Sequence, residues 1–505
     1  MRKKMWLAST LAALLLTAGT VQAQSVSEKI QTLEQELQQL KESQIELKKE
    51  ATAAAAAMPS FSYRPGNGLN IEAADKAWGI RFALETHFRY NFESGRDQVG
   101  RSQGEMMGRR FRPGIIYCIN NCLWEFEATL DLDGWGTGNG KNNQATGVGS
   151  VLQRGAVNFH AEQISPWLPT VQFGMEVQNA AGGSLARQGS GNTGAQAEYD
   201  LHTRNNGFNT GRAGSGIVLN WDDKDLSSIG IPGRIGKFQI GMSQIAEGDD
   251  GTQSLTDRQD FNTYISIQPF SQVKNKWLSG ITFEYGAWFC NADNRSNNGC
   301  DRYRIQDHGD GGRQTLFDSG SNSIGDGLHV AHGPGIVWSV GPYTLRTMGS
   351  FQTSQDRGGT PGKKRSNNFL IGHDLYMWSP KGFLTGSSTD AGSILVGTHF
   401  ERVNMSCGDN LRNGCSNGTT AGTTPQFKRV RVLLREWDLW YVIAPRMNVG
   451  VNVLWYDSSN LRNGANRAAH NLGVCKTPNV TNATGCRNGI GGDWTDVMLN
   501  WRYSF

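Results

Sequence analysis

The stretch Asp493-Trp494-Thr495-Asp496-Val497-Met498-Leu499-Asn500-Trp501-Arg502-Tyr503-Ser504-Phe505 ends the chain and alternates clearly between apolar and polar residues. In an extended strand, successive side chains point to opposite faces. The aromatic and aliphatic residues fall on one face: Val497, Leu499, Trp501, Tyr503 and Phe505. The other face is mainly polar: Asp496, Met498, Asn500, Arg502 and Ser504. The pattern predicts a last β-strand with an apolar and a polar side.

The first 23 residues have the pattern of a secretory signal. Met1-Arg2-Lys3-Lys4 is basic, an apolar run follows, and Val21-Gln22-Ala23 precedes Gln24. We expect the mature chain to begin at Gln24. No later run reaches the roughly 18 consecutive apolar residues that a spanning helix needs. Soluble secretion or a β-barrel therefore remains.

Alternating segments recur through residues 68–505, separated by Gly- and Asn-rich connections, and the last of them ends on an aromatic residue as in bacterial outer-membrane barrels. The candidate strands are 79–93, 109–117, 123–132, 151–160, 170–178, 214–221, 235–246, 260–268, 279–290, 335–340, 343–353, 368–378, 392–404, 427–442, 447–457 and 494–505. Barrels of this kind have even strand numbers, and lipid-facing residues alternate with lumen-facing ones. The sequence predicts an all-β, transmembrane antiparallel β-barrel of about sixteen strands.

The lengths of the connections agree with a barrel. When the candidate strands are numbered along the chain, the short links follow even-numbered strands, and they lie at 118–122, 161–169, 341–342 and 444–446. The long links follow odd-numbered strands, near 133–150, 179–213, 291–334, 405–426 and 458–493. Outer-membrane barrels have short turns on the periplasmic side and long external loops. This sorting favours the barrel over unrelated strands.

Residues 24–50 have apolar positions at alternating spacings of four and three, from Val26 to Leu47, with Gln44 as a polar member. The pattern predicts a short periplasmic coiled coil, followed by a linker at 51–67. So short a helix is marginal alone in water, which favours self-association of identical chains. An isolated solvated helix and a tether toward the cell wall are the alternatives.

All eight cysteines follow the signal and form four neighbouring pairs: Cys118/Cys122, Cys290/Cys300, Cys407/Cys415 and Cys475/Cys486. An even number at short spacings in an oxidising compartment favours four local disulfides. No pair has CxxC spacing with a matching histidine, so we expect no metal site there. His329 and His332, assigned to a loop, are interpreted as incidental.

Composition and motifs argue against an enzyme. The mature chain has 46 basic and 45 acidic residues after loss of Arg2, Lys3 and Lys4, so no large charged surface for nucleic acid is expected. Residues 189–194 fit GxGxxG, but they lie in a long loop without a following helical pattern. No Ser, His and polar residue fall together on one lipid-facing surface. We expect no catalytic residues and no cofactor.

The candidates for an anion path are the arginines that alternation places toward the lumen and those of the third loop. They are Arg81, Arg89, Arg110 and Arg112 on the first two strands, Arg154 on the fourth, and Arg187, Arg204 and Arg212 in the third loop. A guanidinium stays charged and can donate two hydrogen bonds to an oxyanion. The alternative is that these arginines only neutralise Glu85, Glu125, Glu127 and Asp131 across the wall.

Several segments resemble the phosphate-selective porin (porin O/P) family. They are Gly68–Ala73 with Asp75-Lys76, Ile80–Leu84, Arg89–Phe92, Arg109–Arg112, Phe126–Asp131, Val171–Glu176, Met447–Asp457 and Asp496–Phe505. The resemblance implies a sixteen-stranded trimeric porin that passes anions, with the third loop folded into the lumen and arginines lining the path.

The function expected from the sequence is therefore an outer-membrane porin. We expect a homotrimer in outer-membrane lipid that passes small hydrophilic solutes, with a bias to inorganic anions such as phosphate. The alternatives are a non-selective general porin and a barrel that serves as scaffold or sheath for an envelope partner complex.

Overall fold

A computed structural model describes most of the strand regions and one long helix. The described residues are 26–64, 68–94, 103–130, 132, 152–175, 216–227, 230, 232–243, 260–292, 304–306, 315–318, 327–355, 363–406, 429–457 and 493–504. The expected signal at 1–23, the GxGxxG segment at 189–194 and Phe505 lie outside these ranges. The chain divides into two compact units, one containing the helix and the other the strands.

Helix α2 (Val26–Ala57) makes up most of the described part of the first unit. It continues past residue 50 into the expected linker, because alanine has the highest helix propensity and residues 53–57 are all alanine. Leu33, Leu37 and Leu40 of the predicted seam are 63%, 55% and 67% exposed in the single chain. No helix in the described ranges has the length and apolar character needed to cross a membrane.

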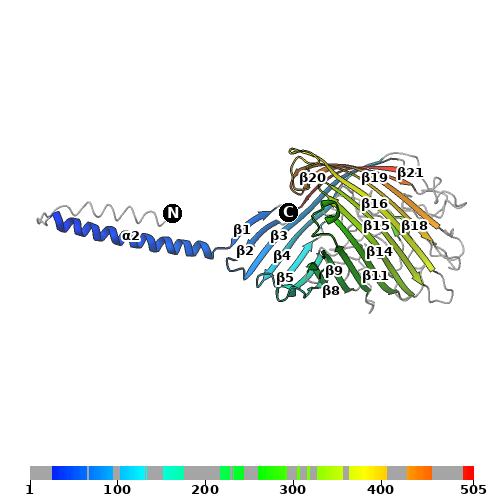
Figure 1. Ribbon diagram of the computed structural model, residues 1–505. Coiled ribbons are helices and arrows are strands. Elements are labelled where there is room, and N and C mark those ends of the chain that lie inside the picture. The colour runs from blue at the N-terminus through cyan, green and yellow to red at the C-terminus, as the bar shows by residue number, and fades with distance from the viewer. Residues whose placement is uncertain are drawn as a thin grey trace, which may run out of the picture. The chain divides into compact units, whose positions relative to one another are not determined.

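The second unit is a closed barrel of sixteen antiparallel strands, as the sequence predicted. The strands are β3 (Trp78–Ser94), β4 (Gln103–Ile119), β5 (Trp124–Leu130), β6 (Leu152–His160), β7 (Thr170–Met175), β8 (Gly216–Asp225), β9 (Arg234–Ser243), β10 (Asp260–Gln268), β11 (Ile281–Ala292), β14 (Gly327–Val340), β15 (Tyr343–Gln355), β16 (Lys363–Ser379), β18 (Ile394–Ser406), β19 (Arg429–Ala444), β20 (Met447–Asp457) and β21 (Asp493–Ser504). They follow one another around the barrel in chain order (Figure 1).

Strands β21 and β3 close the barrel. Their ladder runs from Thr495 opposite Ser94 to Ser504 opposite Glu85. Beyond that point β3 pairs with β2 (Gly68–Glu72), which pairs in turn with β1 (Ser60–Arg64). The Tyr63 and Tyr503 hydroxyls are 2.8 Å apart. Part of the expected linker thus forms a strand that extends the seam past the end of β21.

Short turns join the strands at one end of the barrel, which we call the turn end. The turns β14–β15 and β19–β20 contain two residues each, Gly341-Pro342 and Pro445-Arg446. Smaller elements are η1 (Ala161–Gln163), α3 (Lys276–Ser279), β17 (Gly382–Phe383) and the hairpin β12 (Arg304–Gln306) with β13 (Thr315–Asp318). Strand β14 starts at Gly327, well before the predicted 335, so the assignment of His329 and His332 to a loop was wrong.

The predicted alternation of faces is confirmed on β21. Leu499 and Trp501 are 50% and 45% exposed on the outside, whereas Asn500 and Arg502 are 1% and 2% exposed on the inside. The Phe88 ring of β3 lies 5.9 Å from Trp501 across the seam, so the outer face continues over it. The barrel therefore has an apolar, aromatic exterior and a polar interior, as expected of strands in lipid.

Candidate functional site on the inner face of the barrel

The inner face carries two kinds of polar side chain on two groups of strands. We call the inner residues of β15, β16, β18, β19, β20, β21 and β3 the charged wall, because arginines, histidines and carboxylates lie among them. The inner residues of β5 to β10 form the amide wall, where Asn and Gln predominate. These walls are the candidate site.

The charged wall begins with an ion pair between Arg346 of β15 and Asp374 of β16. Arg346 Nη1 donates to Asp374 Oδ2. The other carboxylate oxygen, Asp374 Oδ1, lies 3.7 Å from His399 Nε2 on β18. The Asp374 and His399 side chains are only 4% and 3% exposed. A buried carboxylate needs such partners, because an isolated buried charge is costly.

His399 connects this pair to two carboxylates on β19. Its Nδ1 lies 2.9 Å from Asp438 Oδ2 and 4.0 Å from Glu436 Oε2. Both carboxylate side chains are 0% exposed. On β20, Asn452 Nδ2 donates to Glu436 Oε1 at 3.2 Å and also to Asp438 Oδ1. Three strands thus contribute to one buried polar cluster.

The contacts continue across the closing seam. Asn500 Nδ2 of β21 donates to Asn452 Oδ1 at 2.7 Å. Asn500 Oδ1 accepts from Arg89 Nε of β3 at 2.8 Å and lies 2.8 Å from His87 Nε2. Beside them, the Arg502 guanidinium lies 4.2 Å from the centre of the Trp440 ring. Side-chain contacts therefore follow the wall from β15 to β3.

Strand register explains why these residues meet. His399 is directly opposite Glu436, and Asp438 is directly opposite Asn452. Glu436 and Asp438 are two residues apart, so they share the inner face of β19. Gly372 is opposite His399 on β16, and a Cβ there would lie 2.3 Å from His399 Cδ2. The imidazole therefore occupies space that a side chain at residue 372 would fill.

The amide wall is held by hydrogen bonds between cross-strand partners, most of which are amides. Gln239 Nε2 donates to Asn220 Oδ1 at 2.8 Å, and Gln172 Nε2 donates to Asn158 Oδ1 at 2.8 Å. Asn158 Nδ2 donates in turn to Glu125 Oε1 at 2.7 Å. An amide has both donor and acceptor groups, so a row of amides can satisfy itself without adding charge.

Two of the predicted arginines have described inner contacts. Arg89 is 1% exposed and is held by Asn500. Arg112 Nη1 lies 3.7 Å from Glu85 Oε2, which is the neutralising contact that the alternative interpretation predicts. Arg81 is on the same face of β3 as Arg89.

The remaining predicted residues are only partly described. Arg110 pairs with His87 and Arg154 with Thr129 in the ladder, but their side chains lie outside the described part. Residues wholly outside the described ranges are Arg187, Arg204, Arg212, Cys300, Cys407, Cys415, Cys475 and Cys486. Cys290 is on β11, and its side chain is likewise not described. The role of these residues stays a prediction.

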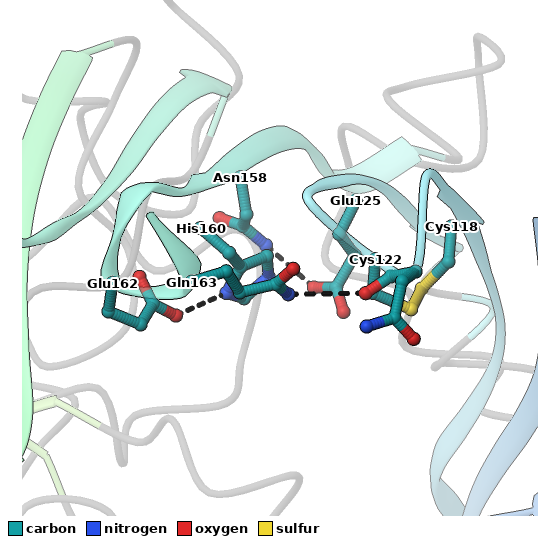
Figure 2. The surroundings of a disulfide bond; sticks show 8 residues. Cys118, Cys122, Glu125, Asn158, His160, Glu162 and Gln163 are labelled. Atoms are coloured by element: carbon teal, nitrogen blue, oxygen red, sulfur yellow. Dashed lines mark hydrogen bonds and ion pairs between the residues drawn. A yellow bond between two sulfur atoms is a disulfide. The ribbon is translucent and has the colours of Figure 1, made fainter. Parts of the chain in front are cut away.

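At the turn end, a disulfide joins Cys118 and Cys122 around the β4–β5 turn (Figure 2). Asn120, Asn121 and Cys122 have φ of 54°, 56° and 59°, three consecutive left-handed residues. That region is unfavourable for residues with a Cβ, although Asn tolerates it best. The disulfide and the hydrogen bond from Asn120 N to Ala77 O at 2.8 Å hold the turn in this conformation.

The neighbouring β6–β7 turn is linked to this one. Gln163 Nε2 donates to Asn121 O at 3.2 Å, and His160 Nδ1 lies 2.8 Å from Glu162 Oε1 (Figure 2). Partial burial acts to raise the pKa of Glu162. Hydrogen bonds from the backbone, His160 and Thr170 outweigh it, so the pKa is lowered from its ordinary value of 4.5.

The sequence analysis missed the cluster of His399, Glu436 and Asp438. Their ligand-type atoms all lie within 4.8 Å of one another in the described structure. Glu436 and Asp438 are two residues apart, the spacing of residues on one face of a strand, so the sequence could have predicted that both face inward. His399 is 37 positions away from Glu436 in the sequence, and only pairing of β18 with β19 brings it close.

Comparison with known proteins finds similar folds at low sequence identity. No protein-family model matches the chain. No curated protein matches it either. Similar solved structures include the anion-selective porin from Comamonas acidovorans, with 9% identity over 85% of this chain and 100% of that chain, at a TM-score of 0.49. The trimer form of OmpT, an outer membrane protein of Vibrio cholerae, also has 9% identity, over 85% of this chain and 100% of that chain, at a TM-score of 0.47. The outer membrane channel DcaP of Acinetobacter baumannii has 9% identity, over 85% of this chain and 98% of that chain, at a TM-score of 0.46.

Proposed function

We propose that the protein is a diffusion channel of the bacterial outer membrane that passes small hydrophilic solutes. The observation that carries this proposal is the closed sixteen-stranded barrel with an apolar exterior and a polar interior. On β19, Trp437, Leu439 and Tyr441 are 53%, 54% and 47% exposed on the outer face, and Glu436 and Asp438 lie on the inner one. Such a wall suits lipid outside and polar solutes inside.

In this orientation the turn end lies in the periplasm and the long connections are external, as in outer-membrane barrels generally. The Cys118–Cys122 disulfide is then on the periplasmic side, an oxidising compartment in which disulfides persist.

We further propose a preference for inorganic anions such as phosphate. Arg112 and Glu85 line the inner face with side chains that are 10% and 25% exposed, whereas Glu436 and Asp438 are at 0%. A passing solute therefore meets Arg112, together with its ion-pair partner Glu85, more directly than the buried acids Glu436 and Asp438. Fixed guanidinium groups at a water-filled path favour anions, because screening is reduced there.

The test is a reversal potential in a salt gradient across a planar bilayer. We expect a shift toward the anion, with phosphate, sulfate and chloride compared in single-channel recordings. Arg112→Gln should lower the anion-to-cation permeability ratio by about two-fold, since one partly screened charge is lost. Arg402→Gln is the matched control, because Arg402 lies on the outer face of β18, where its Nε donates to Asn404 Oδ1 at 3.2 Å.

A current shifted toward the cation, or an unselective one, would reject the anion preference and leave a general porin. Purified protein that conducts no ions, or that carries a stoichiometric partner, would instead favour the scaffold interpretation.

We also propose that three copies associate and that α2 contributes a coiled coil on the periplasmic side. The exposed leucines of α2 support this, since a helix of this kind gains stability by burying an apolar seam. Deleting residues 25–50 should reduce the mass measured in detergent from trimer to smaller species. An intact trimer after deletion would assign the association to the barrels and leave α2 as a tether.

A further inference from the structure

We infer that His399, Glu436 and Asp438 form a binding site for one divalent transition-metal ion on the inner face of the barrel. These residues supply one imidazole nitrogen and two carboxylates from two paired strands, β18 and β19. A mixed set of this type suits first-row divalent ions such as Zn²⁺. The site is independent of the proposed channel function.

The spacing of the donor atoms fits a metal ion. Zinc bonds to nitrogen and oxygen of about 2.0–2.2 Å in a tetrahedral site put neighbouring ligand atoms ~3.3 Å apart. His399 Nδ1 lies 2.9 Å from Asp438 Oδ2 and 4.0 Å from Glu436 Oε2, on either side of that value. Small rotations of the side chains would equalise these distances, and the strand backbones would not need to move.

The second imidazole nitrogen provides an independent observation. His399 Nε2 faces Asp374 Oδ1 at 3.7 Å, and Arg346 holds that carboxylate. Metal-bound histidines commonly direct their other nitrogen at a carboxylate, which fixes the ring orientation and the tautomer. With its proton on Nε2, His399 would present the Nδ1 lone pair to the ion that Glu436 and Asp438 also bind.

The charge of the wall favours a bound cation. The buried acidic residues of these strands are Asp374, Glu401, Glu436, Asp438 and Asp496. Among the described side chains of these strands, the buried arginines set against these five are three, namely Arg89, Arg346 and Arg502. Buried carboxylates require compensating charge. An ion between Glu436 and Asp438 would supply positive charge at the point where these two carboxylates face each other across His399 Nδ1.

The experiment is a calorimetric titration of the untagged, EDTA-treated full-length mature protein in detergent with ZnCl₂. We expect one Zn²⁺ per chain. Glu436→Gln, Asp438→Asn and His399→Gln should each weaken binding by about 10-fold or more, because each replaces a metal ligand with a neutral amide, which binds such ions poorly. His332→Gln is the control, since His332 contacts Tyr285 on the outer face and should leave binding unchanged.

A second measurement does not depend on whether the variants fold. Zinc should raise the thermal unfolding midpoint of the wild-type chain in a saturable way, because it binds the folded state. Mg²⁺, which prefers oxygen ligands, should not do so at equal concentration. Wild-type protein that binds no zinc, or a folded His399→Gln variant that binds it as the wild type does, would overturn the site.

Discussion

The charged wall and the amide wall both consist of inward-facing residues of strands whose side chains alternate between faces, but the first carries charged side chains and the second mainly neutral amides. Within the described residues, β16 and β19 of the charged wall have 17 and 16 residues, and β5 and β7 of the amide wall have 7 and 6. In the charged wall, buried charged groups contact one another, as Arg346 contacts Asp374. In the amide wall, neutral amides bond to one another, as Gln239 does to Asn220. From this difference we expect that removing one partner lowers the free energy of unfolding far more in the charged wall than in the amide wall.

The largest expected effect is therefore in the charged wall. Arg346→Met removes the cation bonded to the buried Asp374 carboxylate and should lower the free energy of unfolding by about 3 kcal/mol. The measurement is the urea midpoint of unfolding in detergent or lipid, with the slope compared to the wild type. An unchanged midpoint would show that Asp374 does not depend on Arg346.

An intermediate effect is expected from the equivalent change in the amide wall. Gln239→Leu removes the donor to Asn220 Oδ1, a neutral buried hydrogen bond, and should cost about 1–2 kcal/mol in the same urea experiment. The ratio of the two losses measures the contrast between the walls. Equal losses for Arg346→Met and Gln239→Leu would contradict it.

The smallest effect is expected at the turn end beside the amide wall. The pKa of Glu162 is lowered on folding from its ordinary value of 4.5, so its carboxylate stabilises the folded state at pH values above 4.5. This contribution is lost as the pH falls through the pKa of the folded state. Glu162→Gln should reduce stability slightly at pH 7, by less than about 1 kcal/mol, and by less at pH 3 than at pH 7. Paired urea curves at the two pH values test this, and an equal loss at both would assign the effect to packing.

Much of the fold could be predicted from local sequence. The faces of β21 follow from alternation alone, and Leu499 and Trp501 lie outside while Asn500 and Arg502 lie inside, as predicted. The strand start at Gly327 was missed because Gly333, Pro334 and Gly335 resemble a turn. The hairpin of β1 and β2 was missed because its strands are five residues each, and their place is set by pairing: β2 pairs with β3, and β1 pairs with β2.

The sequence by itself determined which face each strand residue occupies, because alternation is a local property with a period of two. It therefore determined the barrel, the order of short and long connections, and the inward direction of residues such as Arg112. Only the tertiary structure decided which inward residues meet. That choice depends on register, since the partner of each residue is set by how neighbouring strands align. The pairing of His399 with Glu436, and of Arg89 with Asn500 across the seam, exists only once the barrel has closed.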